Sequence, residues 1–173
     1  VRNQLCALTQ AHLNLTPDRL LSALLDPAVR LGTSTPKADP AGDYAWSLFR
    51  RADTVNAGAY ATLERKALQL TGGPTSPKAP AGRGTYAWVM DQGQADIFLT
   101  YCTNAVAAQA EVPRLKIVAV PPDLQVYADY GLTVRRASHP AAQAFADALL
   151  APSAQAVFAR YGFGSLPSPR AQK

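Results

Sequence analysis

Cysteine and histidine are scarce in this chain of 173 residues. It has only two of each, Cys6, Cys102, His12 and His139, with no Cys-X-X-Cys spacing and no histidine beside a cysteine. This pattern excludes the usual zinc sites, so we expect no bound metal and structural roles for both histidines. Both cysteines fall on segments predicted as strands, and two alternatives stay open. They are free buried thiols, or they form a disulfide, which needs an oxidising compartment.

Long apolar runs are also missing. No stretch of about 18 apolar residues occurs, so no segment is predicted to span a membrane as a helix. The segment from Val1 to Leu8 predicts a strand and lacks the apolar core of a signal peptide. We therefore expect either that the mature start is shown or that an upstream segment is missing.

The chain is basic but lacks a clustered basic surface. Its net charge is +5 and its pI is about 9.4, yet the seventeen Lys and Arg residues are scattered. Adjacent basic residues occur only at 50–51, 65–66 and 135–136. We therefore expect no nucleic acid partner. The positive field would instead draw small anions toward a cleft.

Motifs of enzymatic catalysis are absent as well. The segment 162–166, Gly-Phe-Gly-Ser-Leu, lacks the final glycine of a nucleophile elbow. No metal cluster or acid–base pair stands out elsewhere in the sequence. A binding protein is therefore predicted rather than an enzyme.

What the sequence does have is a regular alternation of strand and helix patterns. Strands are predicted at 2–8, 29–33, 96–101, 115–120 and 126–134. Helices are predicted at 17–25, from 43 onwards, and at 59–70, 85–92, about 140–150 and 154–161. Glycine and proline make 72–84 a loop, and Trp46 and Trp88 are expected in the core. This alternation predicts an α/β fold with a mainly parallel sheet and flanking helices.

The segment 33–46 holds a candidate anion site. It predicts the end of a strand, a loop rich in proline and glycine, and the first turn of a helix. The first N–H groups of a helix have no partner within it, and the helix dipole places positive charge there. Such a loop binds an oxyanion without a charged side chain, and the small side chain of Ala41 suits close approach.

Three segments together resemble one protein family. They are the loop 40–44 (Pro-Ala-Gly-Asp-Tyr), the strand end 99–105 (Leu-Thr-Tyr-Cys-Thr-Asn-Ala) and the closing segment 151–163. In this order and at this spacing they resemble the periplasmic molybdate-binding proteins of ABC importers, which are type II solute-binding proteins. The resemblance extends from about Asn3 to Phe163.

The resemblance implies two α/β lobes joined by crossing strands, with the anion in the cleft between them. Residues 1–120 would form lobe two, residues 121–164 would return to lobe one, and residues 165–173 would be a disordered tail. The opening part of lobe one, which supplies two serine-bearing anion loops in the family, has no counterpart here. Lobe one is therefore expected to be incomplete, and the segment 125–163 could not bury its apolar faces well alone.

The resemblance also assigns three ligand-binding residues. Ala41 would offer its backbone N–H to the anion, and Tyr101, at a strand end, would donate its hydroxyl. Arg83 falls at the position where the family has another backbone N–H donor. Its guanidinium would strengthen anion binding or change its selectivity, with a solvated loop arginine as the alternative.

Ser34, Gly42 and Asp43 are secondary candidates. Ser34 offers a hydroxyl, which is equally explained as that of a strand-end residue, and Gly42 belongs to the anion loop. Asp43 would repel a dianion if it faced inward, and a different ligand would then have to be considered. We expect it instead in the first turn of the helix, pointing away and complementing the dipole.

The resulting functional prediction is a periplasmic solute-binding component of an ABC importer. It would be a monomer that binds molybdate, or else tungstate, without a cofactor and passes it to a transmembrane permease. Donor groups alone would exclude protonated phosphate, because its O–H would find no acceptor. The alternatives are a binding protein for a different small anion, suggested by Arg83 and Asp43, and the ligand-sensing domain of a transcription regulator.

The resemblance further implies a pairing for the two cysteines. It places the strand that enters at the crossing beside the strand that ends at Tyr101. A Cys6–Cys102 disulfide would then tie the hinge edge to the ligand strand.

Overall fold

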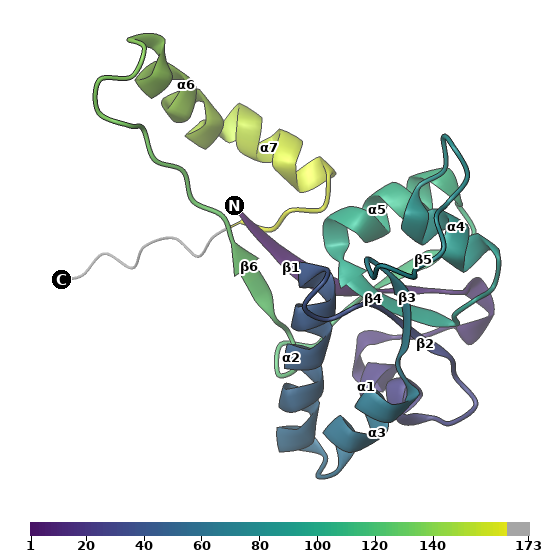
Figure 1. Cartoon of the computed structure of the whole chain (residues 1–173). Helices are drawn as coiled ribbons and strands as arrows, with labels where there is room; N and C mark the ends of the chain where they lie inside the picture. The colour runs from purple at the N-terminus through teal and green to yellow at the C-terminus, as the bar shows by residue number, and fades with distance from the viewer. Residues whose placement is uncertain (166–173) are drawn as a thin grey trace.

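A computed structural model describes residues 1–165, so the predicted tail lies outside the described residues except for Ser165. Strands and helices alternate along most of this length (Figure 1). The strands are β1 (Arg2–Thr9), β2 (Leu31–Ser34), β3 (Leu68–Thr71), β4 (Ile97–Tyr101), β5 (Lys116–Ala119) and β6 (Tyr127–Asp129). The helices are α1 (Leu20–Leu25), α2 (Pro40–Val55), α3 (Ala59–Lys66), α4 (Thr85–Asp91), α5 (Cys102–Glu111), α6 (Ala141–Leu150) and α7 (Pro152–Arg160), with short 3-10 turns η1 (Ala11–Leu13) and η2 (Pro17–Arg19).

The sheet is mixed, which corrects the expectation of a mainly parallel one. Its strand order is β3-β2-β4-β1-β5, and β6 pairs with β1. Strand β2 runs parallel to β3 and β4, whereas β1 runs antiparallel to β4, β5 and β6. Alternating helices fix the direction only of strands joined by a crossover, and β1 precedes that series. One reversed strand in the middle therefore makes three of the pairings antiparallel.

Helices cover both faces of this sheet (Figure 1). Helices α1, α2 and α3 pack on one face through a core that includes Leu24, Phe49 and Leu63. Helices α4 and α5 pack on the other face around Phe98 and Met90. This three-layer arrangement leaves the ends of the strands, rather than their faces, open to a ligand.

Several predicted boundaries shift. Helix α3 ends at Lys66, and the chain continues as β3, where residues 68–71 pair with β2 as the edge strand of the sheet. The predicted strand 126–134 shortens to β6, which pairs only with the first residues of β1. Pairing with neighbouring strands decides the lengths of β3 and β6, and the local sequence pattern does not predict that pairing.

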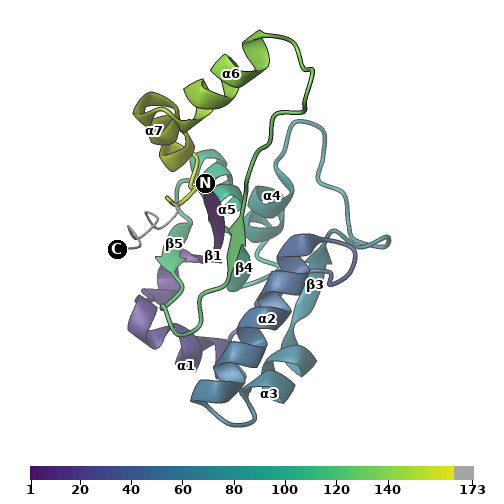
Figure 2. The same ribbon diagram turned by 90° about the vertical axis from the view of Figure 1, so that its left-hand side faces the viewer.

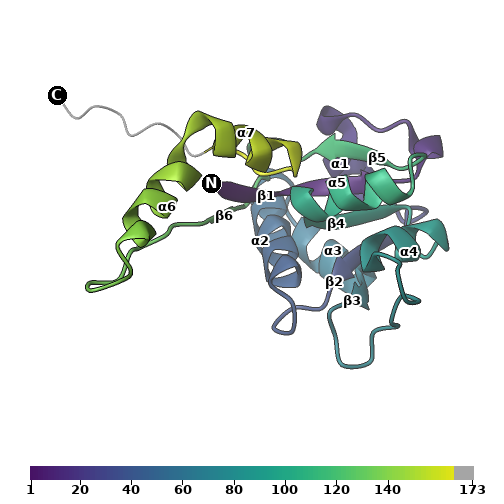
Figure 3. The same ribbon diagram turned by 90° about the horizontal axis from the view of Figure 1, so that it is seen from above.

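The segment 130–163, called the arm here, stands away from the sheet (Figures 2 and 3). Its helices α6 and α7 bury only Ala146 between them. Phe145 is 67% exposed and Leu150 is 64% exposed. The expectation that this segment buries its apolar faces poorly is therefore confirmed, whereas its assignment to a first lobe stays a prediction.

The passage from the sheet to the arm is held by the side chain of Gln125, which is only 4% exposed. Its Oε1 accepts from the Leu5 N–H at 3.0 Å, and its Nε2 donates to the Leu5 carbonyl at 3.0 Å. A side-chain amide thus replaces a strand residue in pairing with β1, between the end of β5 and the start of β6.

Replacing Gln125 with alanine is expected to lower the free energy of unfolding by about 1–3 kcal/mol, because the Leu5 carbonyl is left buried without this donor. Urea unfolding followed by circular dichroism measures the change. The matched control is Gln143→Ala, which removes an exposed amide on α6 that contacts Asp147. Equal losses of stability in the two variants would show that the hydrogen bonds between the Gln125 amide and Leu5 do not stabilise the fold.

Candidate functional site

Three neighbouring parallel strands end at one edge of the sheet, and polar side chains gather there. Strand β2 ends at Ser34, β3 at Thr71, and β4 at Thr100 and Tyr101. Ser34, Thr71 and Thr100 are 2% exposed or less. The carboxyl edge of parallel strands is where α/β proteins usually bind ligands. Sequence analysis placed Ser34 and Tyr101 at strand ends, and the structure brings them to this same edge.

The start of α2 is capped by Asp39. Its Oδ1 accepts from the Ala41 N–H at 2.9 Å, and its backbone carbonyl accepts from the Gly42 N–H at 2.9 Å. The N–H of Ala41 is thus already paired, which corrects the expectation that it is free to meet an anion. The carboxylate of Asp39 is itself an anion, and it suits the positive end of the helix.

A chain of hydroxyl groups connects Asp39 to the strand ends. The Ser34 Oγ lies 2.8 Å from the Thr71 Oγ1 and 3.2 Å from the Tyr86 hydroxyl. The Tyr86 hydroxyl donates to the Asp39 Oδ2 at 3.4 Å. Burial raises the pKa of Tyr86 above its ordinary value, so its hydroxyl stays protonated and remains a donor.

Tyr101 is the last residue of β4 and directly precedes α5. Its ring centroid lies 5.6 Å from that of Tyr44, on α2. Burial raises the pKa of Tyr101, and Tyr44, Tyr130, Asp39 and Tyr86 raise it further by electrostatic effects. Within residues 1–165 its hydroxyl makes no hydrogen bond. Tyr101 therefore presents a protonated donor at the edge of the sheet where β4 ends. Ser34, Thr71, Tyr86, Thr100 and Tyr101 are called the hydroxyl cluster here.

Arg83 is not brought to the hydroxyl cluster. Its guanidinium pairs with Glu111 and with Asp91, at 3.0 Å for the latter, and its backbone N–H donates to the Pro80 carbonyl at 3.0 Å. These bonds raise the pKa of Arg83, with Glu111 the largest cause. Glu111 ends α5, the helix that starts beside Tyr101, and about 14 Å of helix separates the two ends. Arg83 therefore anchors the loop 72–84 rather than meeting an anion at the cluster.

Asp43 and Gly42 have structural roles at the start of α2. Asp43 lies in the first turn, is exposed, and accepts from the Lys37 N–H at 2.9 Å, so it points away as expected. A Cβ on Gly42 would lie 2.6 Å from the Ser34 carbonyl oxygen and 2.7 Å from the Pro36 nitrogen. Only glycine lets α2 approach the end of β2 this closely.

Gly42→Ala is expected to destabilise the fold by about 1–3 kcal/mol, because the added methyl group must push α2 away from backbone that cannot yield. Alanine would otherwise stabilise a helix, so the sign of the change tests the contact. Thermal unfolding measures it. Gly131→Ala is the control, because a Cβ there meets nothing within 4 Å. A Gly42→Ala protein as stable as the parent would refute the close approach.

The structure contains the Cys6–Cys102 disulfide, with the two Cα atoms 4.8 Å apart. Strands β1 and β4 pair in the register Leu5 to Tyr101, which confirms the predicted neighbours. Cys102 lies on the first residue of α5 rather than on a strand, which corrects its predicted position. The bond therefore joins β1 to the helix start directly behind Tyr101.

Sequence analysis missed four members of the site. Asp39 had a signal, since an acidic residue just before proline is a typical helix cap. Thr71 was hidden because the helix predicted for 59–70 covered most of β3. No sequence pattern distinguishes Tyr86 and Thr100 from ordinary buried residues.

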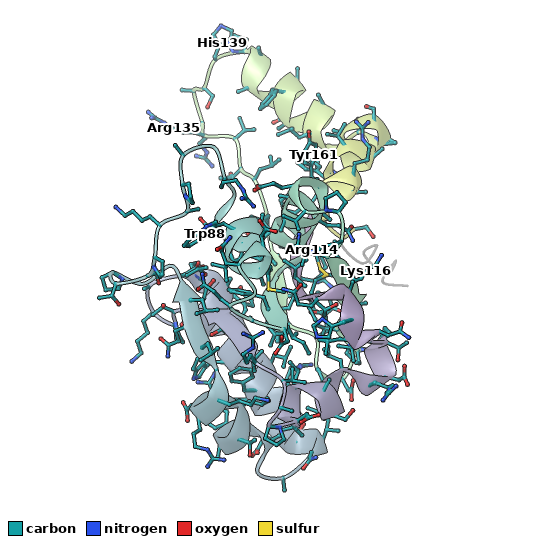
Figure 4. The ribbon with its side chains drawn as sticks, turned by 90° about the vertical axis from the view of Figure 1, so that its right-hand side faces the viewer. Trp88, Arg114, Lys116, Arg135, His139 and Tyr161 are labelled. Atoms are coloured by element: carbon teal, nitrogen blue, oxygen red, sulfur yellow. A yellow bond between two sulfur atoms is a disulfide. The ribbon has the colours of Figure 1, made fainter. Side chains whose placement is uncertain are left out.

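Metal ligands do not gather in the part of the chain that the structure describes. Figure 4 shows His139 at the outer tip of the arm, with Tyr161 nearer the sheet. Across residues 1–165, no helix has both the length and the apolar character that crossing a membrane requires.

The family model for bacterial extracellular solute-binding proteins matches residues 1–164. The chain belongs to this family. The family is one of binding proteins rather than of enzymes, and its location outside the cytoplasm agrees with the disulfide. This chain is also 36% identical over 131 residues to the uncharacterised protein PM1146 of Pasteurella multocida. That alignment covers 75% of this chain and 54% of PM1146, so the chain spans about half the length of this relative.

Solved structures share the fold. A Clostridium difficile protein assigned as the substrate-binding domain of a molybdenum ABC transporter matches with a TM-score of 0.69 and 22% identity, over 96% of this chain and 65% of that one. PEB3 of Campylobacter jejuni with bound L-phospholactate gives 0.65 and 18%, over 95% and 66%. The sulfate-binding protein SubI of Mycobacterium tuberculosis gives 0.58 and 18%, over 96% and 57%. The α/β fold predicted from the sequence, that of periplasmic binding proteins, is therefore confirmed.

Proposed function

We propose that this chain is part of the periplasmic solute-binding component of an ABC importer and that its solute is a small tetrahedral oxyanion. Membership of the extracellular solute-binding family supports the transport role and disfavours a sensor domain of a transcription regulator. The observation that carries the proposal is the hydroxyl cluster at the carboxyl edge of β2 and β4. There the Tyr101 hydroxyl is a protonated donor without a partner among residues 1–165, and Ser34 and Tyr86 add two further hydroxyl groups.

Several solutes fit this description. The sequence resemblance suggests molybdate or tungstate. The structurally similar proteins are named for molybdenum, sulfate and L-phospholactate. Each of these solutes presents oxygen atoms around a tetrahedral centre, and hydroxyl donors match such atoms whatever the central element. The class of solute is thus better supported than its identity.

The proposed mechanism is binding by oriented dipoles, followed by closure. Hydroxyl groups would replace the water shell of the anion without a full positive counter-charge. The arm, and any further part of the first lobe, would close over the edge of the sheet about β1 and β6. The closed surface would then dock on the transmembrane permease, and a monomer suffices for that step.

Calorimetric titration of the protein expressed from its complete gene tests the proposal. The ligands are molybdate, tungstate, sulfate and phosphate, with chloride as a blank. Binding of at least one tetrahedral oxyanion, with a matching rise in melting temperature, is the expected result. Absence of heat and of any thermal shift with all four would refute the proposed solute class.

A further inference from the structure

Aromatic rings border the free hydroxyl of Tyr101. The centroid of the Tyr101 ring lies 5.6 Å from that of Tyr44. Burial, and after it the nearby Tyr44 and Tyr130, raise the pKa of Tyr101, so Tyr130 also lies close to this side chain. The ring of Tyr130 in turn meets that of Phe163 edge to face, with the centroids 5.9 Å apart. Tyr44, Tyr101, Tyr130 and Phe163 are called the aromatic row here.

The register of β1 places this row on one face of the sheet. Leu5 pairs with Tyr101, and Val1 exchanges backbone hydrogen bonds with Tyr130 at 2.8 and 3.4 Å. Every second residue of a strand points to the same face, and so do residues that lie directly opposite each other. Because Leu5 belongs to the core beneath α1, α2 and α3, Tyr101 and Tyr130 point to the face that carries α2, the helix of Tyr44.

The aromatic row is held in place but is not fully covered. Tyr130 is 48% exposed, and the other three rings are partly exposed. Gly164, which follows Phe163, exchanges two backbone hydrogen bonds with Arg2 at 2.9 and 3.0 Å. The backbone on both sides of β1 is therefore paired at this end of the row, and apolar ring surface is left facing solvent beside the site.

An inorganic oxyanion cannot use this ring surface. The face of an aromatic ring carries the negative part of its quadrupole, so it repels the oxygen atoms of an anion. A flat apolar group gains from the same surface, because it leaves water and stacks on the ring. A hydroxyl donor beside aromatic faces thus suits an acid group that is bonded to carbon.

We infer that the solute is an organic oxyanion, in which a tetrahedral acid group is bonded to a flat apolar group such as an aromatic ring. The inference rests on the proposed function, since it names the solute class of the same site. The acid group accepts a hydrogen bond from the Tyr101 hydroxyl, and the flat group extends along the aromatic row over Tyr130.

The experiment compares matched pairs of ligands by calorimetry, using the protein expressed from its complete gene. The pairs are phenyl phosphate with methyl phosphate, and benzenesulfonate with methanesulfonate. At mildly alkaline pH the two members of a pair carry the same charge, so they differ only in the attached group. The phenyl member of at least one pair is expected to bind about 10-fold more tightly or better, because stacking on an aromatic side chain contributes an effect of this size.

Packing alone would also explain an aromatic residue at position 130, and variants separate the two roles. Tyr130→Phe keeps the ring and is expected to keep the preference for the phenyl compound. Tyr130→Ala is expected to reduce that preference about fivefold or more. The matched control is Tyr161→Ala, which removes a 65% exposed ring of the arm that is not part of the aromatic row and should keep the preference. Melting temperatures confirm that the variants are folded.

The outcomes separate this inference from the proposed function. Parent protein that binds molybdate, sulfate or phosphate, but binds the phenyl compounds no more tightly than the methyl ones, overturns the inference and leaves the proposed function standing. A phenyl preference that is undiminished in Tyr130→Ala, or that falls equally in Tyr161→Ala, overturns the role of the aromatic row. Failure of every inorganic and organic oxyanion to bind overturns both.

Discussion

Replacing both Cys6 and Cys102 with alanine should lower the free energy of unfolding by about 4–5 kcal/mol. The two cysteines are 96 residues apart, and cross-linking a loop of about 100 residues removes about 4.7 kcal/mol of chain entropy from the unfolded state. For a domain of this size the melting temperature should fall by about 10–15 °C. Scanning calorimetry of the parent and the double variant measures both quantities.

A reductant provides the matched control for this change. It should lower the melting temperature of the parent protein by a similar amount and leave the double variant unaffected. Because the disulfide joins β1 to the start of α5 behind Tyr101, its loss should also weaken oxyanion binding. A double variant as stable as the parent would contradict the pairing.

Tyr101→Phe should weaken oxyanion binding about 10- to 100-fold, since a hydrogen bond to a charged group contributes about 1.5–3 kcal/mol. The ring and its contact with Tyr44 remain, so the fold should be unaffected. Calorimetric titration with the oxyanion that the parent binds most tightly measures the loss.

Tyr60→Phe is the control for Tyr101→Phe. The Tyr60 hydroxyl donates to Glu64 on α3 at 2.8 Å. Tyr60 lies beside Asp53 near the end of α2, whereas the hydroxyl cluster lies near the start of that helix. The Tyr60→Phe variant should bind the anion as tightly as the parent protein does. A Tyr101→Phe protein whose affinity stays within twofold of the parent would remove Tyr101 from the site.

The sequence was informative where local patterns decide the structure. Alternating strand and helix segments predicted the α/β fold, and strand ends marked Ser34 and Tyr101. The direction of β1 could not be predicted, because no crossover helix joins it to its partners. The strand β3 was missed because its edge pairing with β2, rather than its composition, makes it extended.

The candidate site was only partly predictable for a related reason. A loop before a helix predicts N–H donors, but whether those donors are free depends on one neighbouring side chain. Here Asp39 takes the N–H of Ala41, and the pair Asp91 and Glu111 takes the guanidinium of Arg83. Tyr86 reaches the cluster from α4, across a loop whose path the sequence does not determine.

A crystal structure grown with the tetrahedral oxyanion that the protein binds most tightly tests the site most directly. The anion should lie within hydrogen-bond distance of the Tyr101 and Tyr86 hydroxyls. An anion bound elsewhere in a fully occupied crystal, with the hydroxyl cluster holding only water, would contradict this assignment.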